Sequence, residues 1–559
     1  MTEEQDKSSV TLGVFLLDCL KKEGIREIFG IPGDYNFTLL DALEQYEGID
    51  FINGRNELNA GYAADGYARI KGMAALITTF GVGELSACNA IAGSYSESVP
   101  VIHIVGSPKS MLQQEHKLLH HTLHDGNYDA FRQVYEPITA YTAVVTPQNA
   151  AIEIPAAIRI AKERKKPVYL VVAIDQVTQP IVPRSFQPED KQTNASSLEA
   201  ATAHARRLLD NAKSAVILAD HPVQRYGLGP QVQKLSEAMQ IPTASMMLGK
   251  SSLDESHANY IGMYGGAFGS QEVSAVVEEA DCVLAVGVVW SDSNTANFTA
   301  KLESSRMIRI QPDHVQIGEA AYRNIKAEDM LSALQAVGFQ PKAGIPQVSF
   351  PYDTVTGGAD EPLTSASYYP RFQRMLKQDD ILVVDTGTLT YGLSQVRLPQ
   401  GVDYIAQAGW ESIGYATPAA FGASVAGGQR RVLLFTGEGA LQLTVQEISS
   451  LLAGGYHPII FVLNNSGYTI EKYLNVKTRN QKYNEIPQWS YTKLVEAFGG
   501  DAYTVQVRTN GELDDAIEEA ARRNAESMSI IELITDPMDA PAYLHKMREY
   551  LKMQENQQS

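Results

Sequence analysis

The chain has 559 residues, of which 44% are hydrophobic and 20% are charged, values typical of a soluble globular protein with several domains. Its 65 acidic and 46 basic residues give a net charge of −19, which argues against nucleic acid or an anionic membrane as a partner. Cys19, Cys88 and Cys282 are too few and too scattered for a disulfide framework or a zinc site. The N-terminus is polar and no apolar run has membrane-spanning length, so the sequence predicts a cytoplasmic protein.

The first predicted domain, residues 1–180, alternates helical and strand patterns as a doubly wound α/β fold does. An amphipathic helix is expected over residues 12–22, and another begins at Asn56-Glu57 and runs towards Arg69. Strands are expected over residues 27–31, 50–52, 74–79, 101–105 and 167–172. The segment from Gly81 to Glu84 follows one of these strands and fits a ligand-facing loop and a helix entry equally well.

Two stretches without periodicity, residues 179–197 and 341–362, are predicted to be linkers. The second domain, residues 197–340, lies between them. Its strands are expected over residues 215–219, 281–287 and 307–310. Its glycines form no dinucleotide-binding fingerprint, so neither a nicotinamide nor a flavin cofactor is predicted.

The third domain, residues 363–559, repeats the rhythm of the first, which suggests an internal duplication. Its strands are expected over residues 381–384, 431–436, 459–463 and 529–533, with a helix over roughly 444–452 and another at the C-terminus.

Polar side chains follow two of these strands, in the turn Gly437-Glu438-Gly439-Ala440 and in the pair Asn464-Asn465. Because parallel strands end at the same edge of a sheet, where α/β proteins bind ligands, these groups are expected to converge. Oxygen atoms from Glu438 and Asn465 suit Mg2+. Taken alone, the same pattern also fits an ordinary βαβ turn with a solvated asparagine pair.

The segment from Gly437 to Asn465 resembles the thiamin diphosphate motif, in which Asn-Asn follows Gly-Asp-Gly after about two dozen residues. Here 24 residues separate Gly439 from Asn464, and Glu438 stands where the family usually has Asp. Further stretches resemble the pyruvate and indolepyruvate decarboxylase subgroup. They are Ile31–Asn36, Asn56–Ala60, Tyr62–Arg69, His120-His121, Trp410–Gly414 and Gly467–Glu471.

This resemblance implies an α/β protein of three doubly wound parallel-sheet domains, which would be pyrimidine-binding, middle and diphosphate-binding in chain order. It implies a lyase that uses thiamin diphosphate and Mg2+ to convert a 2-oxo acid into an aldehyde and CO2. Pyruvate, branched-chain and aromatic acids such as phenylpyruvate and indolepyruvate stay open as substrates. The family's cofactor spans two subunits, so a homodimer or homotetramer is expected. The alternatives are a carboligase of the acetolactate synthase type and a non-catalytic relative with a decayed site, the latter prompted by Glu438.

Glu57 is implied to be catalytic by binding the pyrimidine N1′ of the cofactor, which requires a buried carboxyl with a raised pKa. The sequence also allows that Glu57 merely caps the helix it begins. The other residues implied to act at the reacting carbon are Asp34, His120, His121 and Glu471. On its own, the histidine pair also fits a surface loop or a chance metal site that includes His116 and His124.

The remaining implied roles concern the metal, the cofactor and the substrate. The metal ligands are Glu438, Asn465 and the carbonyl of Gly467. The cofactor contacts are Glu57, Thr388, Glu411, Ile413, Gly437, Glu438, Gly439, Ala440, Asn465, Gly467 and Tyr468. The substrate pocket is lined by Ser293, Thr390, Tyr391 and Ile470. Because Ser293 and Thr390 are small, branched or aromatic side chains would fit, although Ala542 and Tyr543 could refill part of this space.

Overall fold

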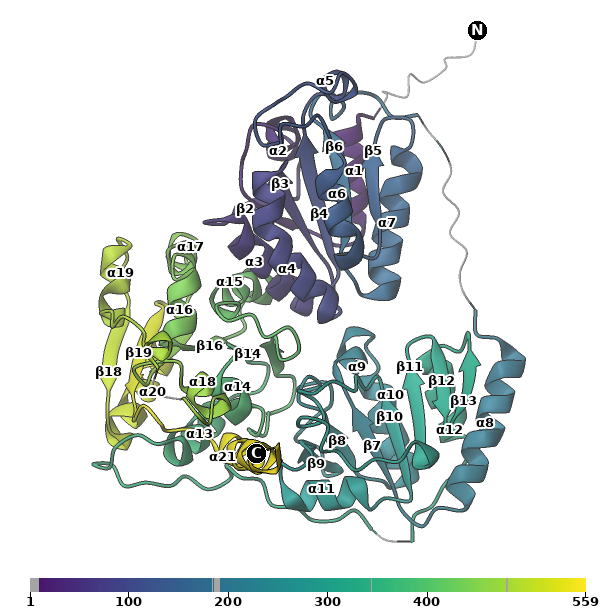
Figure 1. Ribbon diagram of the computed structural model, residues 1–559, viewed down its shortest axis with the longest axis vertical. Coiled ribbons are helices and arrows are strands. Elements are labelled where there is room, and N and C mark those ends of the chain that lie inside the picture. The colour runs from purple at the N-terminus through teal and green to yellow at the C-terminus, as the bar shows by residue number, and fades with distance from the viewer. Residues whose placement is uncertain (1–9, 183, 185–191, 343, 479–480, 559) are drawn as a thin grey trace. The chain divides into compact units, whose positions relative to one another are not determined.

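The computed structural model describes residues 10–182, 184, 192–342, 344–478 and 481–558. They form three β-sheets with helices around them (Figure 1). The ends of the first and third predicted domains at 1–9 and 559 lie outside the described residues, as do 183, 185–191 and 343 of the predicted linkers. The chain divides into two compact units. The first comprises residues 1–189 together with 418–428 and 446–454, and the second comprises the rest.

The first unit contains a six-stranded parallel sheet in the order β2-β1-β3-β4-β6-β5. The strands are β1 (Glu27–Gly30), β2 (Asp50–Asn53), β3 (Ala74–Thr79), β4 (Val101–Ser107), β5 (Thr142–Val145) and β6 (Val168–Ala173). The helices are α1 (Leu12–Lys22), α2 (Phe37–Glu44), α3 (Glu57–Lys71), α4 (Val82–Ser96), α5 (Ser110–Gln114), α6 (Ala130–Tyr135) and α7 (Ala150–Arg164).

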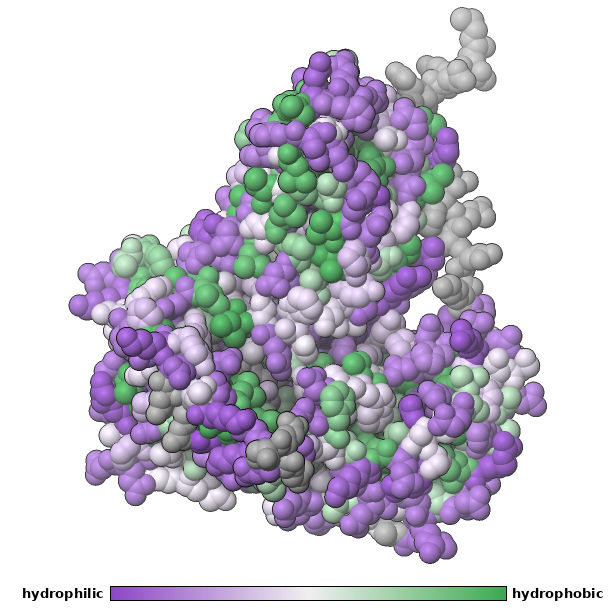
Figure 2. Space-filling view, in the orientation of Figure 1, coloured by the Kyte–Doolittle hydropathy of each residue, from purple (hydrophilic) through white to green (hydrophobic). Residues whose placement is uncertain are grey.

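Helices cover both faces of this sheet (Figure 1). Apolar side chains of α1, α2 and α7 share one core with the sheet, while α3 and α4 pack together on the opposite side. Strands β3, β4 and β6 are buried along their whole length, as continuous apolar runs in the middle of a parallel sheet should be. Figure 2 shows apolar side chains gathered over the α3 and α4 face, where Val82 and Leu85 are 55% and 41% exposed.

The second unit begins with the middle sheet, whose strand order is β13-β12-β11-β10-β7-β8-β9. The strands are β7 (Ala215–Ala219), β8 (Thr243–Ser245), β9 (Tyr260–Met263), β10 (Cys282–Val286), β11 (Met307–Gln311), β12 (His314–Ile317) and β13 (Ala320–Arg323). The helices around it are α8 (Ala195–Asp210), α9 (His221–Arg225), α10 (Gly229–Met239), α11 (Gln271–Glu278) and α12 (Ala327–Gln335).

The last sheet is parallel throughout, in the order β15-β14-β16-β17-β19-β18. The strands are β14 (Ile381–Val384), β15 (Asp403–Ala406), β16 (Val432–Gly437), β17 (Ile459–Asn464), β18 (Tyr503–Val507) and β19 (Ser529–Ile534). The helices of this part of the chain are α13 (Ser365–Met375), α14 (Thr388–Leu393), α15 (Ala416–Gly427), α16 (Glu438–Thr444), α17 (Glu447–Ala453), α18 (Thr469–Leu474), α19 (Leu494–Ala497), α20 (Asn510–Arg523) and α21 (Ala542–Gln558). Of these, α17 and most of α15 belong to the first unit.

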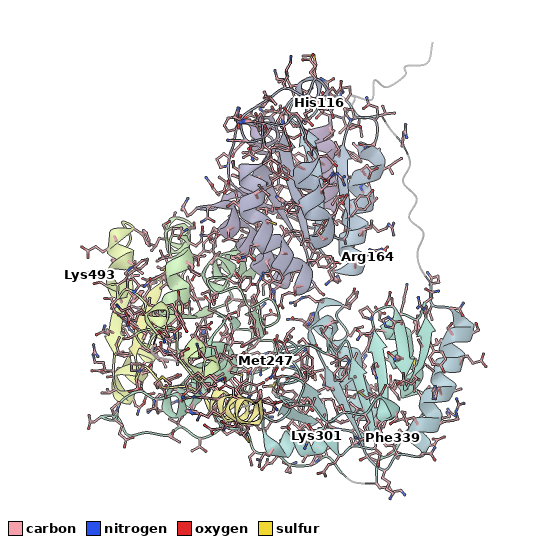
Figure 3. All side chains as sticks on the ribbon, in the orientation of Figure 1. His116, Arg164, Met247, Lys301, Phe339 and Lys493 are labelled. Carbon is pink, nitrogen blue, oxygen red and sulfur yellow. The ribbon has the colours of Figure 1, made fainter. Side chains whose placement is uncertain are left out.

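The first and last sheets have the same topology. In each, the second, first, third, fourth, sixth and fifth strands of the chain order stand side by side. This identity of strand order fits the internal duplication that the sequence rhythm suggests. A separate apolar cluster within the second unit joins Met247 of the middle domain, labelled in Figure 3, to Tyr543 and Leu544 of α21.

Most predicted strands are found within two residues of their expected bounds. Two expectations are corrected. The helix expected over roughly 444–452 is two helices, and the first of them, α16, begins directly at Glu438 because Gly437 serves as its N-cap in an extended conformation. The middle sheet is not purely parallel, since β12 and β13 form an antiparallel hairpin at its edge.

The ambiguous segment after β3 is a helix entry. Gly81 is the N-cap of α4, and the Glu84 side chain accepts a hydrogen bond from the Gly81 amide, as in a capping box. Among the described residues, no helix combines the length and apolar character that crossing a membrane requires.

Candidate active site

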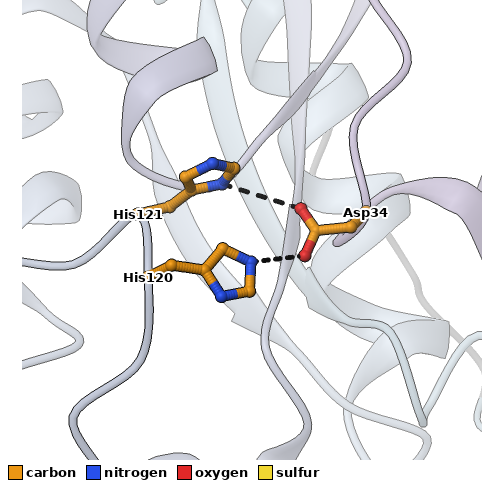
Figure 4. A group of neighbouring side chains, drawn as sticks. All are labelled: Asp34, His120 and His121. Carbon is orange, nitrogen blue, oxygen red and sulfur yellow. Dashed lines mark hydrogen bonds and ion pairs between the residues drawn. The ribbon is translucent and has the colours of Figure 1, made fainter.

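Asp34, His120 and His121 meet in the first unit (Figure 4). Asp34 lies in the turn between β1 and α2, and the histidines lie in a turn between α5 and α6. The Oδ2 atom of Asp34 is 2.6 Å from Nε2 of His120, and its Oδ1 atom is 3.6 Å from Nδ1 of His121. One carboxylate therefore faces two imidazoles, although 86 residues of sequence separate Asp34 from His120.

Tyr35 contacts His120 of this cluster with both its ring and its hydroxyl group. Its ring stacks on His120 with centroids 4.9 Å apart, and its hydroxyl group lies 3.4 Å from Nδ1 of His120. The two nitrogen atoms of His120 thus face an acceptor and a hydroxyl group, which fixes the orientation of the ring. His116 lies apart from this cluster, because its Nδ1 is 2.9 Å from the carbonyl oxygen of Gly126.

A glycine makes the position of the histidine loop possible. Gly81 has a φ of 69°, and a Cβ atom there would lie 1.9 Å from the carbonyl oxygen of His121. The loop therefore packs directly on the backbone at the start of α4, where only glycine fits without displacement. His121 itself adopts a left-handed conformation with a φ of 62°.

Next to this contact lies Glu84, which the sequence suggested only as part of the segment from Gly81 to Glu84. Its side chain is fully buried. Its Oε1 accepts the Gly81 N–H at 2.7 Å, and its Oε2 accepts the hydroxyl group of Tyr169. Burial raises the pKa of Glu84 to about 7, although these two hydrogen bonds act in the opposite direction. Glu84 thus anchors the glycine on which the histidine loop rests.

Glu57 is the first residue of α3, behind the N-cap Asn56, whose side chain accepts the amide of Asn59. It lies beside the start of α4, because a Cβ atom on Gly83 would be 3.2 Å from Oε1 of Glu57. Its side chain is only partly buried within the part of the chain that the structure describes, where we expected full burial. The reason is its place in the first turn of α3, at the open edge of the sheet.

Glu447 of α17, another residue that sequence reasoning missed, holds the beginning of α3. It is fully buried, and its Oε1 accepts hydrogen bonds from the amide of Arg55 at 2.8 Å and from the side chain of Asn59 at 3.2 Å. Its Oε2 has no hydrogen-bond partner among the described residues. Since Arg55 and Asn59 flank Glu57, this carboxyl fixes the backbone that presents Glu57.

In the second unit, Glu438 and Asn465 lie at the carboxyl ends of the neighbouring strands β16 and β17. The Oε1 atom of Glu438 accepts the amide of Gly467 at 2.8 Å. Burial raises the pKa of Glu438 to about 7, against the effect of hydrogen bonds from backbone amides, of which that of Gly467 is the largest. Asn465 is buried beside them, whereas Asn464 turns into the sheet and donates to Glu532.

This edge brings together a carboxylate, an amide and the backbone of Gly467, which are the hard oxygen donors that fit a magnesium ion. The ring of Tyr468 lies against Gly439, while a Cβ atom on Gly437 would meet no described atom within 4 Å. Ala440 is buried in the first turn of α16. The donor set and the open backbone at Gly437 therefore fit the diphosphate group that the sequence predicts here.

Asp385 follows β14 at the same edge and was also missed. It is fully buried and accepts hydrogen bonds from the amides of Thr386 and Gly414 and from the hydroxyl group of Thr436, each at 3.0 Å. Burial raises its pKa to about 7. The loops that it joins carry Thr388, which is buried, and Ile413, which is half-buried. A carboxylate directly after an apolar strand is the sequence signal that could have identified it.

The predicted pocket residues lie in two groups within the second unit. Tyr391 stacks on Tyr543 with centroids 5.3 Å apart, and both pack with Ile470 in one apolar cluster. Ser293 donates a hydrogen bond of 3.4 Å to Oε1 of Glu411.

Thr390 and Ala542, two residues considered for the pocket, differ in burial. Thr390 is buried and donates to the carbonyl oxygen of Asp385 at 2.6 Å, so its hydroxyl group is engaged by the backbone. Ala542, the first residue of α21, is exposed next to the buried Tyr543, and its contribution to the pocket stays a prediction.

The predicted catalytic residues belong to both units. Glu57, Asp34, His120 and His121 belong to the first unit, whereas Glu471, exposed in the first turn of α18, belongs to the second.

Comparison with known proteins identifies the family. Three family models match: the N-terminal TPP binding domain of thiamine pyrophosphate enzymes over residues 10–129, their central domain over 202–335 and their C-terminal TPP binding domain over 385–533. "Pyruvate decarboxylase isozyme 1" of Saccharomyces cerevisiae is 37% identical over 554 residues, which is 96% of this chain and 97% of the relative. "Alpha-keto-acid decarboxylase" of Mycobacterium leprae is 37% identical over 97% of this chain and 96% of its own length.

A third relative, "Alpha-keto-acid decarboxylase" of Mycobacterium ulcerans, is 39% identical over 96% of this chain and 95% of its own length. These similarities agree with the three observed sheets, and they confirm the predicted α/β class and the predicted thiamin diphosphate cofactor. The chain belongs to the thiamine pyrophosphate enzyme family.

Proposed function

We propose that this chain is a non-oxidative 2-oxo acid decarboxylase that depends on thiamin diphosphate and releases an aldehyde and CO2. The observation that carries the proposal is the cluster of Asp34, His120 and His121, in which one carboxylate faces two imidazoles. Nε2 of His120 lies 2.6 Å from Oδ2 of Asp34, so the ring has a fixed orientation beside an acid, an arrangement suited to proton transfer. The names of the relatives support the same reaction.

Bound thiamin diphosphate supplies the electron sink that a 2-oxo acid lacks when it loses CO2. Glu57 would hold the pyrimidine ring at its N1′ atom, with the first domain, residues 1–180, binding this ring. The third domain, residues 363–559, would bind the diphosphate, with Mg2+ held by Glu438, Asn465 and the carbonyl oxygen of Gly467. Glu471 would help to place the substrate carboxylate and transfer protons.

The test is aldehyde release from pyruvate, 2-oxoisovalerate, phenylpyruvate and indolepyruvate, with thiamin diphosphate and Mg2+ added or withheld. Aldehyde that forms only in the presence of both would support the proposal, and the order of kcat/KM would rank the substrates. An acetohydroxy acid formed without free aldehyde would favour a carboligase instead. A protein that retains the cofactor but turns over none of these acids would contradict the proposal.

We also propose that the active form is a closed homodimer or homotetramer. The family's cofactor spans two subunits, and closed symmetry is the usual form of such an assembly. The exposed apolar side chains of Val82 and Leu85 on α4 support a covered surface there, since contiguous exposed apolar side chains often mark an interface. Light scattering coupled to gel filtration tests the proposal, and a catalytically competent monomer would contradict it.

A further inference from the structure

Glu411 has a backbone conformation that its side chain disfavours. Its φ is 57°, in the left-handed region where residues other than glycine, asparagine and aspartate are uncommon. A hydrogen bond of 3.0 Å from its amide to the carbonyl oxygen of Gln407 accompanies this conformation. The chain therefore keeps a glutamate at a position where glycine would be less strained, and such strain is retained most often at functional sites.

The Glu411 carboxylate lies among side chains predicted to form the substrate pocket. Its Oε1 accepts the hydroxyl group of Ser293 at 3.4 Å. The stacked rings of Tyr391 and Tyr543 lie within reach of its charge, and both rings are packed in the apolar cluster with Ile470. All of these residues belong to the second unit.

The charge of Glu411 acts on both tyrosines. Burial is the main reason that the pKa of Tyr391 is raised above its usual range, and the negative charge of Glu411 is the next. For Tyr543 the causes are burial, then Tyr391, then Glu411. The negative charge of the Glu411 carboxylate therefore acts on the side chains of this aromatic cluster, while Glu411 itself is exposed.

We propose that Glu411 is a specificity-determining residue whose carboxylate binds the far end of the substrate side chain, so that 2-oxo acids with an N–H or O–H donor there are preferred. This inference rests on the proposed decarboxylase function. A donor such as a phenol, an indole or a guanidinium group forms a charge-assisted hydrogen bond with the carboxylate. A hydrocarbon side chain of the same size desolvates the carboxylate without replacing the lost hydrogen bonds, and its binding is weakened.

A structural role for Glu411 makes a different prediction. If its only task were to hold the loop of Ser293, its removal would lower turnover of every substrate by a similar factor. The ratio between two substrates that differ by a single donor separates the two roles. The decisive quantity is kcat/KM for 4-hydroxyphenylpyruvate divided by kcat/KM for phenylpyruvate.

The experiment measures this ratio in the wild-type holoenzyme, in Glu411→Gln and Glu411→Leu, and in the control Asp292→Asn. Asp292 is a neighbouring acid whose charge also acts on Tyr391, so the control removes a nearby charge and leaves the Glu411 carboxylate in place. We expect a ratio of about 10 or more in the wild type and in Asp292→Asn, about 2 to 5 in Glu411→Gln, and about 1 or less in Glu411→Leu.

Each outcome has one meaning. Aldehyde release with the same ratio in wild type and Glu411→Gln would overturn this inference and leave the proposed function standing. A ratio of about 1 in the wild-type enzyme would also overturn this inference and leave the proposed function standing. The test therefore does not depend on whether Glu411→Leu folds. No aldehyde from any acid, with thiamin diphosphate bound, would overturn the proposed function and this inference with it.

Discussion

Replacement of Glu84 by glutamine tests whether the buried carboxyl next to the histidine loop is mainly neutral. Glu84 is fully buried and holds the Gly81 amide and the Tyr169 hydroxyl group. Glutamine has nearly the same shape and can still accept the Gly81 N–H. The variant Glu84→Gln should therefore fold, but it loses a group whose pKa burial raises from 4.5 to about 7.

The sign of the effect follows from proton binding. Because the pKa of Glu84 is higher in the folded chain than in the unfolded chain, the folded state binds the extra proton between about pH 4.5 and pH 7. The stability that this proton contributes is complete below pH 4.5 and is lost as the pH rises through 7. A rise in pKa from 4.5 to about 7 corresponds to a contribution of about 3 kcal/mol to the free energy of unfolding. Glu84→Gln carries no such group, so its stability relative to wild type should increase by about 3 kcal/mol between pH 4.5 and pH 8.

The assay is urea unfolding followed by far-UV circular dichroism at several pH values from 4.5 to 8. Because a protein with several domains need not unfold in one step, hydrogen exchange of the peptide that spans β3 and α4 should be measured in parallel. Glu163→Gln, on the exposed side of α7, is the matched control and should follow wild type. Parallel pH profiles for Glu84→Gln and wild type would refute the reasoning, because they would show that Glu84 is ionised in the folded chain at all these values.

Three further substitutions test the site directly. Glu57→Gln should keep the fold and bound thiamin diphosphate but lose aldehyde release by a factor of about 100 or more, as expected for loss of general acid–base catalysis; full activity would remove Glu57 from the proposed mechanism. Glu438→Asp should retain the cofactor equally well or better during gel filtration in Mg2+, and weaker retention would show that the site has adapted to glutamate. Gly81→Ala places a Cβ atom 1.9 Å from the carbonyl oxygen of His121 and should lower kcat as well as stability. The control Gly24→Ala has a similar φ of 89° with no described atom within 4 Å, so it should cost only about 1 to 2 kcal/mol of stability, and equal effects of the two substitutions on kcat would contradict the argument.

The buried strands could be predicted from sequence because their apolar runs have one structural meaning. Strands such as β3, β6 and β14 are buried along their whole length, and short, largely apolar runs bounded by turn residues favour such strands. The strands not predicted include β5, β8, β9, β15 and β18. Of these, β5 and β18 lie at sheet edges and are only partly buried, so their sequences alternate weakly. The hairpin of β12 and β13 carried a usable signal in Gly318-Glu319, a two-residue connection with glycine at a φ of 56°.

The helix at Glu438 shows where turn signals mislead. Two glycines close together indicate a turn, and the predicted helix was therefore placed several residues too late. In the structure Gly437 ends the strand and caps α16, so strand and helix join with no intervening loop. A carboxylate in the first turn is favoured by the helix dipole, which is a physical reason for an acid at this position independent of any metal.

The cluster of Asp34, His120 and His121 could not be derived from spacing in the sequence. Asp34 and the histidine pair come from separate loops, and only the resemblance to a known family placed them together before the structure did. The supporting acids Glu84, Glu447 and Asp385 were missed for a different reason. Each accepts a hydrogen bond from a backbone amide, and residue types do not show which amide that is; only the place of Asp385 directly after an apolar strand and the capping-box position of Glu84 were usable signals.

These supporting acids explain how loops at an open sheet edge can be rigid enough to position a reaction. At three places in the described part of the chain, a buried carboxyl accepts two or three hydrogen bonds and so holds the neighbouring backbone. Asp385 does this for the segments that precede α14 and α15, through the amides of Thr386 and Gly414, and Glu84 does it for Gly81, the N-cap of α4 on which the histidine loop packs. Both acids have pKa values raised to about 7 by burial, so both are held by geometry that the surrounding fold imposes. Substitution of either acid should therefore act on turnover through loop position, even though neither residue is placed at the reacting carbon.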